Sequence, residues 1–505
     1  MLFQSLTAST LSANAQLARE NLLWIDGVEL RADFLSAVPT DALARFPQLL
    51  QPGKNDRGVP VILTIRRRRD GGNFEGDEGK RLRLLRDAVG AGNFSFVDLE
   101  EDLSASGSDE EVRRAAYKSG TRVIRSFHSF DGTGGDLGER LVRLSALPGE
   151  IPRISVVPHS TRELLQLVRA SLRARGQRIV VGMGDYGFPS RILSPVLGNT
   201  LSFCSQNSAE RVEAGVDPRT MQELYRYSTL NQSTAIYAVI GNPIMHSRSP
   251  AYHNPRFAAA GMNAVYVPIR VDSVSSFFDL AGELDIPGVS VTIPHKESVI
   301  PFLKEIDESV TAVGACNTIV RDEEGYRGTN TDVDGFLTPL ANRASKRWAG
   351  GLAGRAATVI GAGGASRAVI YALIREGVNV CVLNRTESRA RAVTEELSPY
   401  ARNASLTWGK LGQPEGNCLL SGHSDIIVQT TSVGMFPDTD SDPIPEYRFH
   451  GHELVYDIVY NPPVTRFLSR AADCGCEVIQ GGEMFEGQAL LQSHLFQNAY
   501  RLRSS

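Results

Sequence analysis

The segment from Thr358 to Glu376 carries the clearest chemical signal in this sequence. A short apolar run, Thr358–Ile360, leads into Gly361-Ala362-Gly363-Gly364-Ala365, and a helical pattern follows from Val369. Glycines allow a tight turn and a close approach to a pyrophosphate, which the amides and the positive end of the helix then bind. This order predicts a dinucleotide site whose phosphate-binding residues are Gly361, Gly363, Gly364 and Ala365.

The end of the next apolar run indicates which nicotinamide cofactor the site favours. Val378–Leu383 is followed by Asn384-Arg385-Thr386. An NAD site usually carries Asp or Glu about 20 residues after the turn, where it binds both ribose hydroxyls. An acid there would repel a 2′-phosphate, whereas Arg385 can pair with one. We therefore predict NADP rather than NAD, bound at this end by Asn384, Arg385 and Thr386.

Polar loops between Gly241 and Asp332, together with a late glutamine, supply a second set of chemical groups. Each loop alone is more typical of a capped turn than of a catalytic loop. Together they suit a polyhydroxylated ligand, because every buried polar group left unpaired costs ~1–3 kcal/mol. The set comprises Ser247, Ser249, Thr292, Lys296, Asn317, Asp332 and Gln488.

Three series of strand and helix patterns must position these groups. A chain of 505 residues is expected to form about three domains at roughly 150 residues each. Strand and helix patterns alternate over residues 1–228, which predicts a parallel sheet, open or closed into a barrel. New series begin at Ala235 and Ala356, after a polar linker and a glycine-rich basic segment. We predict an α/β protein with domains at 1–228, 234–345 and 350–479.

Composition excludes several classes of protein. The net charge of -4 gives no general attraction to nucleic acid or to an anionic membrane. No secretory signal and no run of ~18 apolar residues is present, so we expect a cytoplasmic protein. The cysteines lack the spacing of a zinc or redox motif, and we predict no metal site. The densest charge cluster, Arg66–Arg69, is interpreted as a solvated strand end in preference to a phosphate or carboxylate site.

The second half of the chain, from Ile236 onward, resembles the shikimate dehydrogenases. The resemblance lies in the order of the loops described above and in Gly288–Lys296, Gly328–Asp332 and Asp457–Pro462. It implies that residues 480–505 return to the substrate domain and that residues 350–479 form a Rossmann domain. Two departures are Gln429 and Phe485, where the family more often has Asn and Leu.

The same resemblance implies a reaction and the residues that perform it. Hydride passes reversibly between NADPH and a ring carbonyl, while Lys296 moves the proton and Asp332 orients it. Shikimate and quinate both remain open as substrates, because one ring hydroxyl separates them. The implied substrate-binding residues are Ser247, Ser249, Thr292, Asn317, Tyr460 and Gln488.

The first half resembles the type I 3-dehydroquinate dehydratases, which are (β/α)8 barrels. Glu29-Leu30-Arg31, Leu63–Arg66 and Ser126–Phe130 carry the resemblance. It implies a lysine that forms a Schiff base with the substrate and a histidine that acts as acid and base. His128 stands at the histidine position. The residues matching polar binding positions are Glu29, Arg31, Arg66 and Arg191.

The lysine that this family requires is missing. The corresponding strand, Ile151–Val156, carries Arg153, and no lysine occurs between Lys118 and Lys296. A guanidinium with a pKa above about 12 cannot act as a neutral amine nucleophile. We therefore predict an inactive barrel that can still bind a cyclic hydroxy-carboxylate through its arginines.

The fusion of these two parts resembles the C-terminal end of the fungal pentafunctional shikimate-pathway enzyme and also the fungal quinate repressor. No P-loop precedes the first strand, so we expect a shortened relative or an incomplete gene product. One hypothesis is an active NADP-dependent dehydrogenase carrying an inactive barrel. The alternative is a repressor-like regulator that senses pathway metabolites, contacts an activator protein and acts in the nucleus. No DNA-reading motif is visible, so neither hypothesis includes direct DNA binding.

Overall fold

The computed structural model describes residues 1–36, 40–50, 58–205 and 215–504. The chain forms two compact units, Met1–Ile286 (unit 1) and Pro287–Ser505 (unit 2). The boundary between the units falls inside the segment 234–345, which the sequence predicts to be one domain. No helix in the described ranges is long and apolar enough to cross a membrane.

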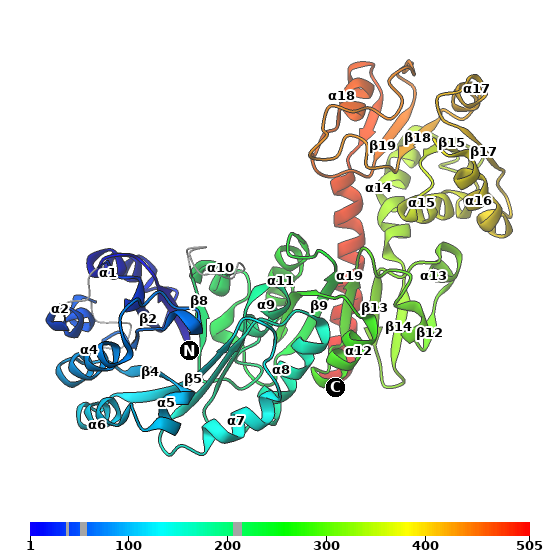
Figure 1. Cartoon of the computed structure of the whole chain (residues 1–505). Helices are drawn as coiled ribbons and strands as arrows, with labels where there is room; N and C mark the ends of the chain where they lie inside the picture. Colours follow the sequence, from blue (N-terminus) through cyan, green and yellow to red (C-terminus); the bar gives the residue numbers. More distant parts are fainter. Residues whose placement is uncertain (37–39, 51–57, 206–214, 505) are drawn as a thin grey trace. The chain divides into compact units, whose positions relative to one another are not determined.

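The first part of unit 1 is a parallel eight-stranded sheet that nearly closes into a barrel, as Figure 1 shows for the N-terminal part of the chain. The strand order is β7-β6-β5-β4-β3-β2-β1-β8, and β1 pairs in parallel with both β2 and β8. This confirms the predicted barrel. The strands are β1 Leu2–Leu6, β2 Gly27–Arg31, β3 Val61–Thr64, β4 Phe96–Glu100, β5 Arg122–Ser129, β6 Ile151–Val156, β7 Ile179–Gly182 and β8 Ser202–Cys204.

Helices follow the strands of the barrel, and side-chain caps fix where several of them begin. Thr10, Asp77 and Ser160 each accept a backbone amide of the first turn of the following helix, which satisfies a donor that the helix leaves unpaired. The helices are α1 Leu11–Asn21, α2 Thr40–Ala44, α3 Phe46–Leu49, α4 Glu78–Ala91, α5 Glu101–Ser106, α6 Glu110–Ser119, α7 Leu137–Ser145, α8 Thr161–Arg173, α9 Gly184–Ile192 and α10 Pro218–Glu223.

The interior of the barrel changes from apolar to charged along the strands. One buried cluster contains Phe3, Ile62 and Ile151 near the starts of their strands. Residues of one strand face the interior alternately, so the next inward positions of β2 and β6 are Glu29 and Arg153, both nearly inaccessible to solvent. Polar side chains thus gather toward the carboxyl ends of the strands, where barrels of this kind hold their ligands.

The rest of unit 1 is a pair of parallel strands with two helices. β9 (Ala235–Gly241) and β10 (Ala264–Arg270) pair along their full length, with Arg270 opposite Gly241. Helices α11 (Ser249–Ala259) and α12 (Val274–Glu283) follow them. Within this unit α12 packs on α8, and α9 packs on β10.

Unit 2 opens with a small antiparallel arrangement and two long helices. β13 pairs antiparallel with β11 and β14, and β12 pairs with β14. Helices α14 and α19 run side by side (Figure 1), so the end of the chain packs on the helix that begins at Thr331. The elements are β11 Gly288–Val291, β12 Glu305–Ile306, α13 Glu308–Val313, β13 Thr318–Arg321, β14 Tyr326–Thr329, α14 Thr331–Arg347 and α19 Gly481–Ser504.

The remainder of unit 2 is a six-stranded parallel sheet in the order β17-β16-β15-β18-β19-β20. The order reverses at β15, and ligands of such sheets bind at the carboxyl ends beside that reversal. This confirms the predicted Rossmann-like architecture. The elements are β15 Ala356–Ile360, α15 Gly364–Arg375, β16 Asn379–Asn384, α16 Glu387–Leu397, β17 Leu406–Lys410, α17 Pro414–Gly422, β18 Ile426–Gln429, β19 Leu454–Asp457, α18 Arg466–Asp473 and β20 Glu477–Ile479.

Candidate active site and barrel pocket

Lys296 and Asp332 form a direct ion pair in unit 2. Lys296 Nζ donates to Asp332 Oδ2 at 2.5 Å, and the side chains remain 30% and 17% exposed. Lys296 follows β11 in the chain, and Asp332 lies in the first turn of α14. The ammonium group is therefore held in place yet still accessible to a ligand, as proton transfer requires.

Hydrogen bonds from one turn hold both members of this pair. Asn330 caps α14 by accepting from the Asp332 amide at 3.1 Å, and its side chain donates to the Ala315 carbonyl at 2.8 Å. The Cys316 amide donates to the Lys296 carbonyl at 2.8 Å. The turn before β13 is thus bonded to the lysine loop and to the start of α14.

Asn317, a predicted substrate residue, lies buried in a hydrogen-bond network. Its Oδ1 accepts from the Thr331 amide at 2.8 Å and from the Thr318 hydroxyl at 2.7 Å. Gln492 of α19 donates to Thr318 Oγ1 at 2.8 Å and accepts from the Ser290 hydroxyl at 2.8 Å. Asn317 therefore also has a structural role. Sequence reasoning missed Gln492, whose partners lie far away in the sequence.

Gln488 and Tyr460 lie on or beside α19. A Cβ added to Gly335 would come within 2.6 Å of Gln488 Cβ, so α19 crosses α14 closely there, one turn after Asp332. This places Gln488 near the ion pair. The Tyr460 ring, 46% exposed, lies 5.9 Å from the ring of Phe485, the residue at which the sequence departs from the family pattern.

The three predicted substrate residues with a hydroxyl group, Ser247, Ser249 and Thr292, are divided between the two units. Thr292 directly follows β11, and its carbonyl accepts from the His295 amide at 2.9 Å. Ser247 and Ser249 lie in unit 1, where the Ser249 amide at the start of α11 donates to Ser247 Oγ at 3.2 Å. The residues in unit 2 are Thr292, Lys296, Asn317, Asp332, Tyr460 and Gln488.

The glycine-rich turn has the geometry of a phosphate site. Gly361 has a φ of +117°, and a Cβ there would meet Thr430 Oγ1 at 2.6 Å, so both conformation and space require glycine. Gly363 is the N-cap of α15 and provides no capping side chain, which leaves the amides of the first turn for a ligand. Gly363, Gly364 and Ala365 are exposed. These residues fit the pyrophosphate of a dinucleotide.

The end of β16 presents cations where the ribose of such a cofactor is expected. Arg385 is exposed, and no ion pair of its side chain is found in the part of the chain that the structure describes. Asn384 Nδ2 donates to the Thr386 carbonyl at 2.9 Å. Lys410, which the sequence analysis missed, lies beside Asn384 in the register of β16 and β17. Arg385 and Lys410 together suit a 2′-phosphate.

The barrel contains a pocket whose charged groups are paired with one another. Arg153 donates to Glu29 Oε1 at 2.7 Å and to Asp98 Oδ2 at 3.0 Å. Arg66 donates to Asp98 Oδ1 at 3.1 Å. The pocket is lined by Ser5, Glu29, Arg31, Phe34, Arg66, Asp70, Gly71, Gly72, Asn73, His128, Phe130, Arg153, Ser155, Val181, Met183, Arg191 and Phe203. All six residues predicted for this site thus lie together, and Asp98 joins them beneath.

These arginines set the charge state of the neighbouring groups. Burial alone would raise the pKa of Glu29, but Arg153, Arg66 and Arg31 outweigh it and hold the pKa at about 2. Burial, followed by the charges of Arg66 and Arg153, lowers the pKa of His128 well below its usual value. His128 is therefore neutral at pH 7, and Arg153 serves as a counter-ion to buried carboxylates.

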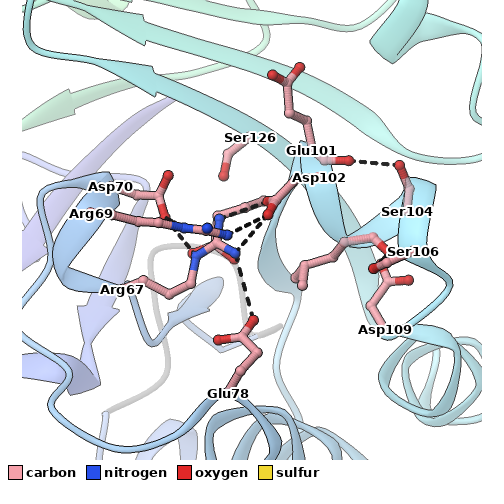
Figure 2. A network of polar contacts seen from close by, with 12 residues as sticks. Arg67, Arg69, Asp70, Glu78, Glu101, Asp102, Ser104, Ser106, Asp109 and Ser126 are labelled. Carbon is pink, nitrogen blue, oxygen red and sulfur yellow. Dashed lines mark hydrogen bonds and ion pairs between the residues drawn. The ribbon is translucent and has the colours of Figure 1, made fainter.

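The interpretation of Arg66–Arg69 as a solvated strand end is wrong for Arg66 and Arg67, whereas Arg68 and Arg69 are exposed as it expects. Arg66 is buried in the pocket, and Arg67 makes two bonds to Asp102, at 2.7 and 3.0 Å. Figure 2 shows Arg67 and Arg69 converging on Asp102, with Asp70 bonded to Arg67 at 2.6 Å. The partners Asp98 on β4 and Asp102 on α5 lie 32 and 35 positions from Arg66 and Arg67, so the local sequence does not reveal these pairs.

Arg153→Ala is expected to destabilise the barrel by roughly 3 kcal/mol at pH 7, because it leaves two buried carboxylates short of a counter-ion. The pKa of Glu29 falls from 4.5 to about 2 on folding. Its pairing therefore stabilises fully above pH 4.5, and the effect of the substitution shrinks as the pH falls toward 2. Urea unfolding across this range measures it. Arg114→Ala, which removes an exposed pair with Glu110, is the control. Equal effects of both substitutions would contradict the account.

Comparison with known proteins identifies the families that successive segments of the chain match. Three family models match successive segments: type I 3-dehydroquinase over residues 2–232, the shikimate dehydrogenase substrate binding domain over 239–319, and shikimate/quinate 5-dehydrogenase over 343–410. The chloroplastic bifunctional 3-dehydroquinate dehydratase/shikimate dehydrogenase of Arabidopsis thaliana is 30% identical over 497 residues, covering 95% of this chain and 79% of the relative. The chain belongs to the family of type I 3-dehydroquinase–shikimate dehydrogenase fusions.

Other similar proteins match one or both parts of this fusion. The shikimate dehydrogenase (NADP(+)) of Moorella thermoacetica is 39% identical over 262 residues, covering 51% of this chain and 86% of the relative. The solved structure of dehydroquinate dehydratase and shikimate dehydrogenase from S. pombe AroM is 24% identical, with a TM-score of 0.43, and covers 99% of this chain and 97% of that chain. The family model over residues 343–410 and the Arabidopsis relative confirm the predicted membership in a dehydrogenase family of oxidoreductases.

Proposed function

We propose that unit 2 and the β9–α12 segment make this fusion protein an NADP-dependent dehydrogenase of shikimate or quinate. The observation that carries the proposal is the Lys296–Asp332 ion pair at 2.5 Å, which lies in the same unit as an open phosphate-binding turn. The relatives named above include enzymes of this activity. The Arabidopsis relative is named as a bifunctional enzyme, and the Moorella relative is named as an NADP(+) shikimate dehydrogenase. Neither is named as a regulator, so these relatives give the repressor alternative no support.

The proposed reaction exchanges a ring carbonyl for a ring hydroxyl. A nicotinamide cofactor held by the turn at Gly361–Ala365 would supply the hydride to the carbonyl carbon, or accept it in the reverse direction. Lys296 donates a proton to the carbonyl oxygen as the hydride arrives and takes it back when the hydroxyl is oxidised. Asp332 orients Lys296 by its hydrogen bond and balances the charge of the ammonium group whenever Lys296 is protonated.

The substrate's hydroxyls and carboxylate need several donors and acceptors around this pair. Within unit 2 we assign them to Thr292, Asn317, Tyr460 and Gln488; in unit 1, Ser247 and Ser249 stay predicted substrate residues. Gln488 approaches α14 one turn from Asp332, and Asn317 is fixed by the turn that also holds Lys296. Fixed polar groups recognise a hydroxylated ring because a mismatched ligand leaves them unpaired.

NADP preference is proposed from the cations at the end of β16. Arg385 and Lys410 would pair with the 2′-phosphate, and no carboxylate stands at Asn384-Arg385-Thr386 to bind a free ribose diol. The test is kcat/KM for NADP and for NAD with the same substrate. We expect a ratio of at least about tenfold in favour of NADP, the value of one charge-assisted hydrogen bond; equal values would overturn the assignment.

The barrel is proposed to be inactive as a Schiff-base dehydratase. Arg153 occupies the lysine position and is tied to Glu29 and Asp98. Borohydride treatment in the presence of 3-dehydroquinate should therefore leave no covalent adduct on the barrel peptides, as judged by mass spectrometry. A lysine-containing type I dehydratase treated in parallel is the positive control. An adduct on a barrel lysine, or dehydration above the uncatalysed rate, would contradict this proposal.

A further inference from the structure

Within unit 1 the barrel meets the β9–β10 segment through three sets of polar contacts. Asp272, just after β10, accepts from the Thr161 amide at 2.8 Å and from the Thr161 hydroxyl at 2.6 Å. Arg169 of α8 donates to Glu283 of α12 at 2.6 Å. The third set is centred on Arg270. Each set joins a barrel helix to an element of the dehydrogenase part.

The Asp272 contact is a strong anchor. Thr161 is the first residue of α8, so the carboxylate sits at the positive end of a helix, where an anion is stabilised. Burial alone would raise the pKa of Asp272, but the bonds from Thr161 outweigh it and lower the pKa. The carboxylate is therefore charged at neutral pH, and β10 is held firmly against the barrel.

The contacts of Arg270 reach the loop from Asn242 to Ser249, called here the substrate loop because it carries the two predicted substrate serines. It is the last residue of β10 and lies opposite Gly241, the last residue of β9. Its Nε donates to Asn242 Oδ1 at 3.0 Å, and its NH1 donates to Asp185 Oδ2 at 2.9 Å. Its guanidinium also lies over the Tyr186 ring, 5.0 Å from the centroid. One side chain thus joins the barrel to the loop that begins at Asn242.

The two residues that Arg270 joins, Asn242 and Asp185, each lie beside a predicted ligand site. Asn242 begins the short loop that ends at Ser247 and Ser249, the serines assigned to the substrate. Asp185 lies in the first turn of α9. Met183, the residue before α9, and Arg191, in the last turn of α9, both line the barrel pocket. The barrel's α9 is therefore shared between the pocket wall and the link to the substrate loop.

We propose that Arg270 is a positioning residue through which the barrel's Asp185 holds the substrate loop of the dehydrogenase. The proposal rests on the dehydrogenase function assigned above. Asp185 fixes the guanidinium from one side, and the guanidinium fixes the Asn242 amide from the other. This gives the barrel a role in substrate binding that requires no lysine in its own pocket.

Asp185→Asn tests the link because it removes the charge while keeping the size of the side chain. The Arg270 and Asp185 side chains are 33% and 40% exposed, and pairs of this kind change an equilibrium at most about fivefold. We expect the KM for the ring substrate to rise about two- to fivefold, while kcat and the KM for NADP stay within about twofold. Asp185→Glu should restore the wild-type KM.

Arg169→Ala is the matched control, because it removes the Arg169–Glu283 pair of the same interface without touching the substrate loop. Its KM should equal that of the wild type, and thermal unfolding should show all three variants folded. An unchanged KM in Asp185→Asn, or an equal rise in Arg169→Ala, overturns the proposal while wild-type turnover stands. A wild-type protein without turnover overturns the proposed function and this proposal with it.

Discussion

Replacing Lys296 with alanine is expected to lower kcat by about 100-fold or more, with a much smaller change in the KM for NADP. General acid–base groups contribute about 10²- to 10⁴-fold to rate, and Lys296 is the group held by Asp332 at 2.5 Å. Without it, the ring oxygen must exchange its proton with water. Steady-state rates of nicotinamide oxidation and reduction measure the effect in both directions.

Lys304→Ala provides the control for this substitution. Lys304 lies in the same unit, is 54% exposed and pairs with Glu324 at 3.2 Å on the surface. Its removal should leave kcat within about twofold of the wild type, since exposed pairs contribute little. Residual activity of Lys296→Ala above about a tenth of the wild-type rate would assign the proton transfer to another group.

Replacing Arg385 with alanine is expected to raise the KM for NADP about tenfold or more and to leave the KM for NAD nearly unchanged. Hydrogen bonds to a charged group contribute about 1.5–3 kcal/mol, and only NADP carries the 2′-phosphate. Arg385 is exposed and has no ion-pair partner among the residues that the structure describes. The cost therefore comes from the lost phosphate contact and not from a disrupted protein network.

Arg391→Ala, six residues further along the chain on α16, is the control for Arg385→Ala. Arg391 lies on α16 and pairs with Glu395 at 2.7 Å, and both side chains are largely exposed. Its loss should change neither KM. A parallel rise in the KM for both cofactors after Arg385→Ala would show that Arg385 supports the turn in general and does not read the phosphate.

The sequence predicted the features that depend on neighbouring residues. The strand–turn–helix order around Gly361 identified the nucleotide turn, and its φ of +117° explains why glycine is needed there. The alternating strand and helix patterns predicted parallel sheets, and the family resemblances identified the first as a barrel and the last as a Rossmann domain. Arg153 was recognised as a departure because the family resemblance places a lysine on the strand Ile151–Val156.

The sequence could not predict contacts between residues that lie far apart along the chain. Arg153 and Glu29 are separated by 124 positions, and Gln492 reaches Thr318 across 174. The burial of Arg66 and Arg67 was missed for the same reason, since their partners Asp98 and Asp102 lie on β4 and α5. Charge patterns show which groups are present, but the fold decides which of them become buried partners.

The measurement that tests the central claim most directly is the initial rate of NADP reduction by the full chain with shikimate and, separately, with quinate. The account predicts turnover with at least one of the two, at a rate that falls about 100-fold or more in Lys296→Ala. No turnover of either compound with NADP or with NAD, in a protein that binds one of them by calorimetry, would contradict the dehydrogenase assignment.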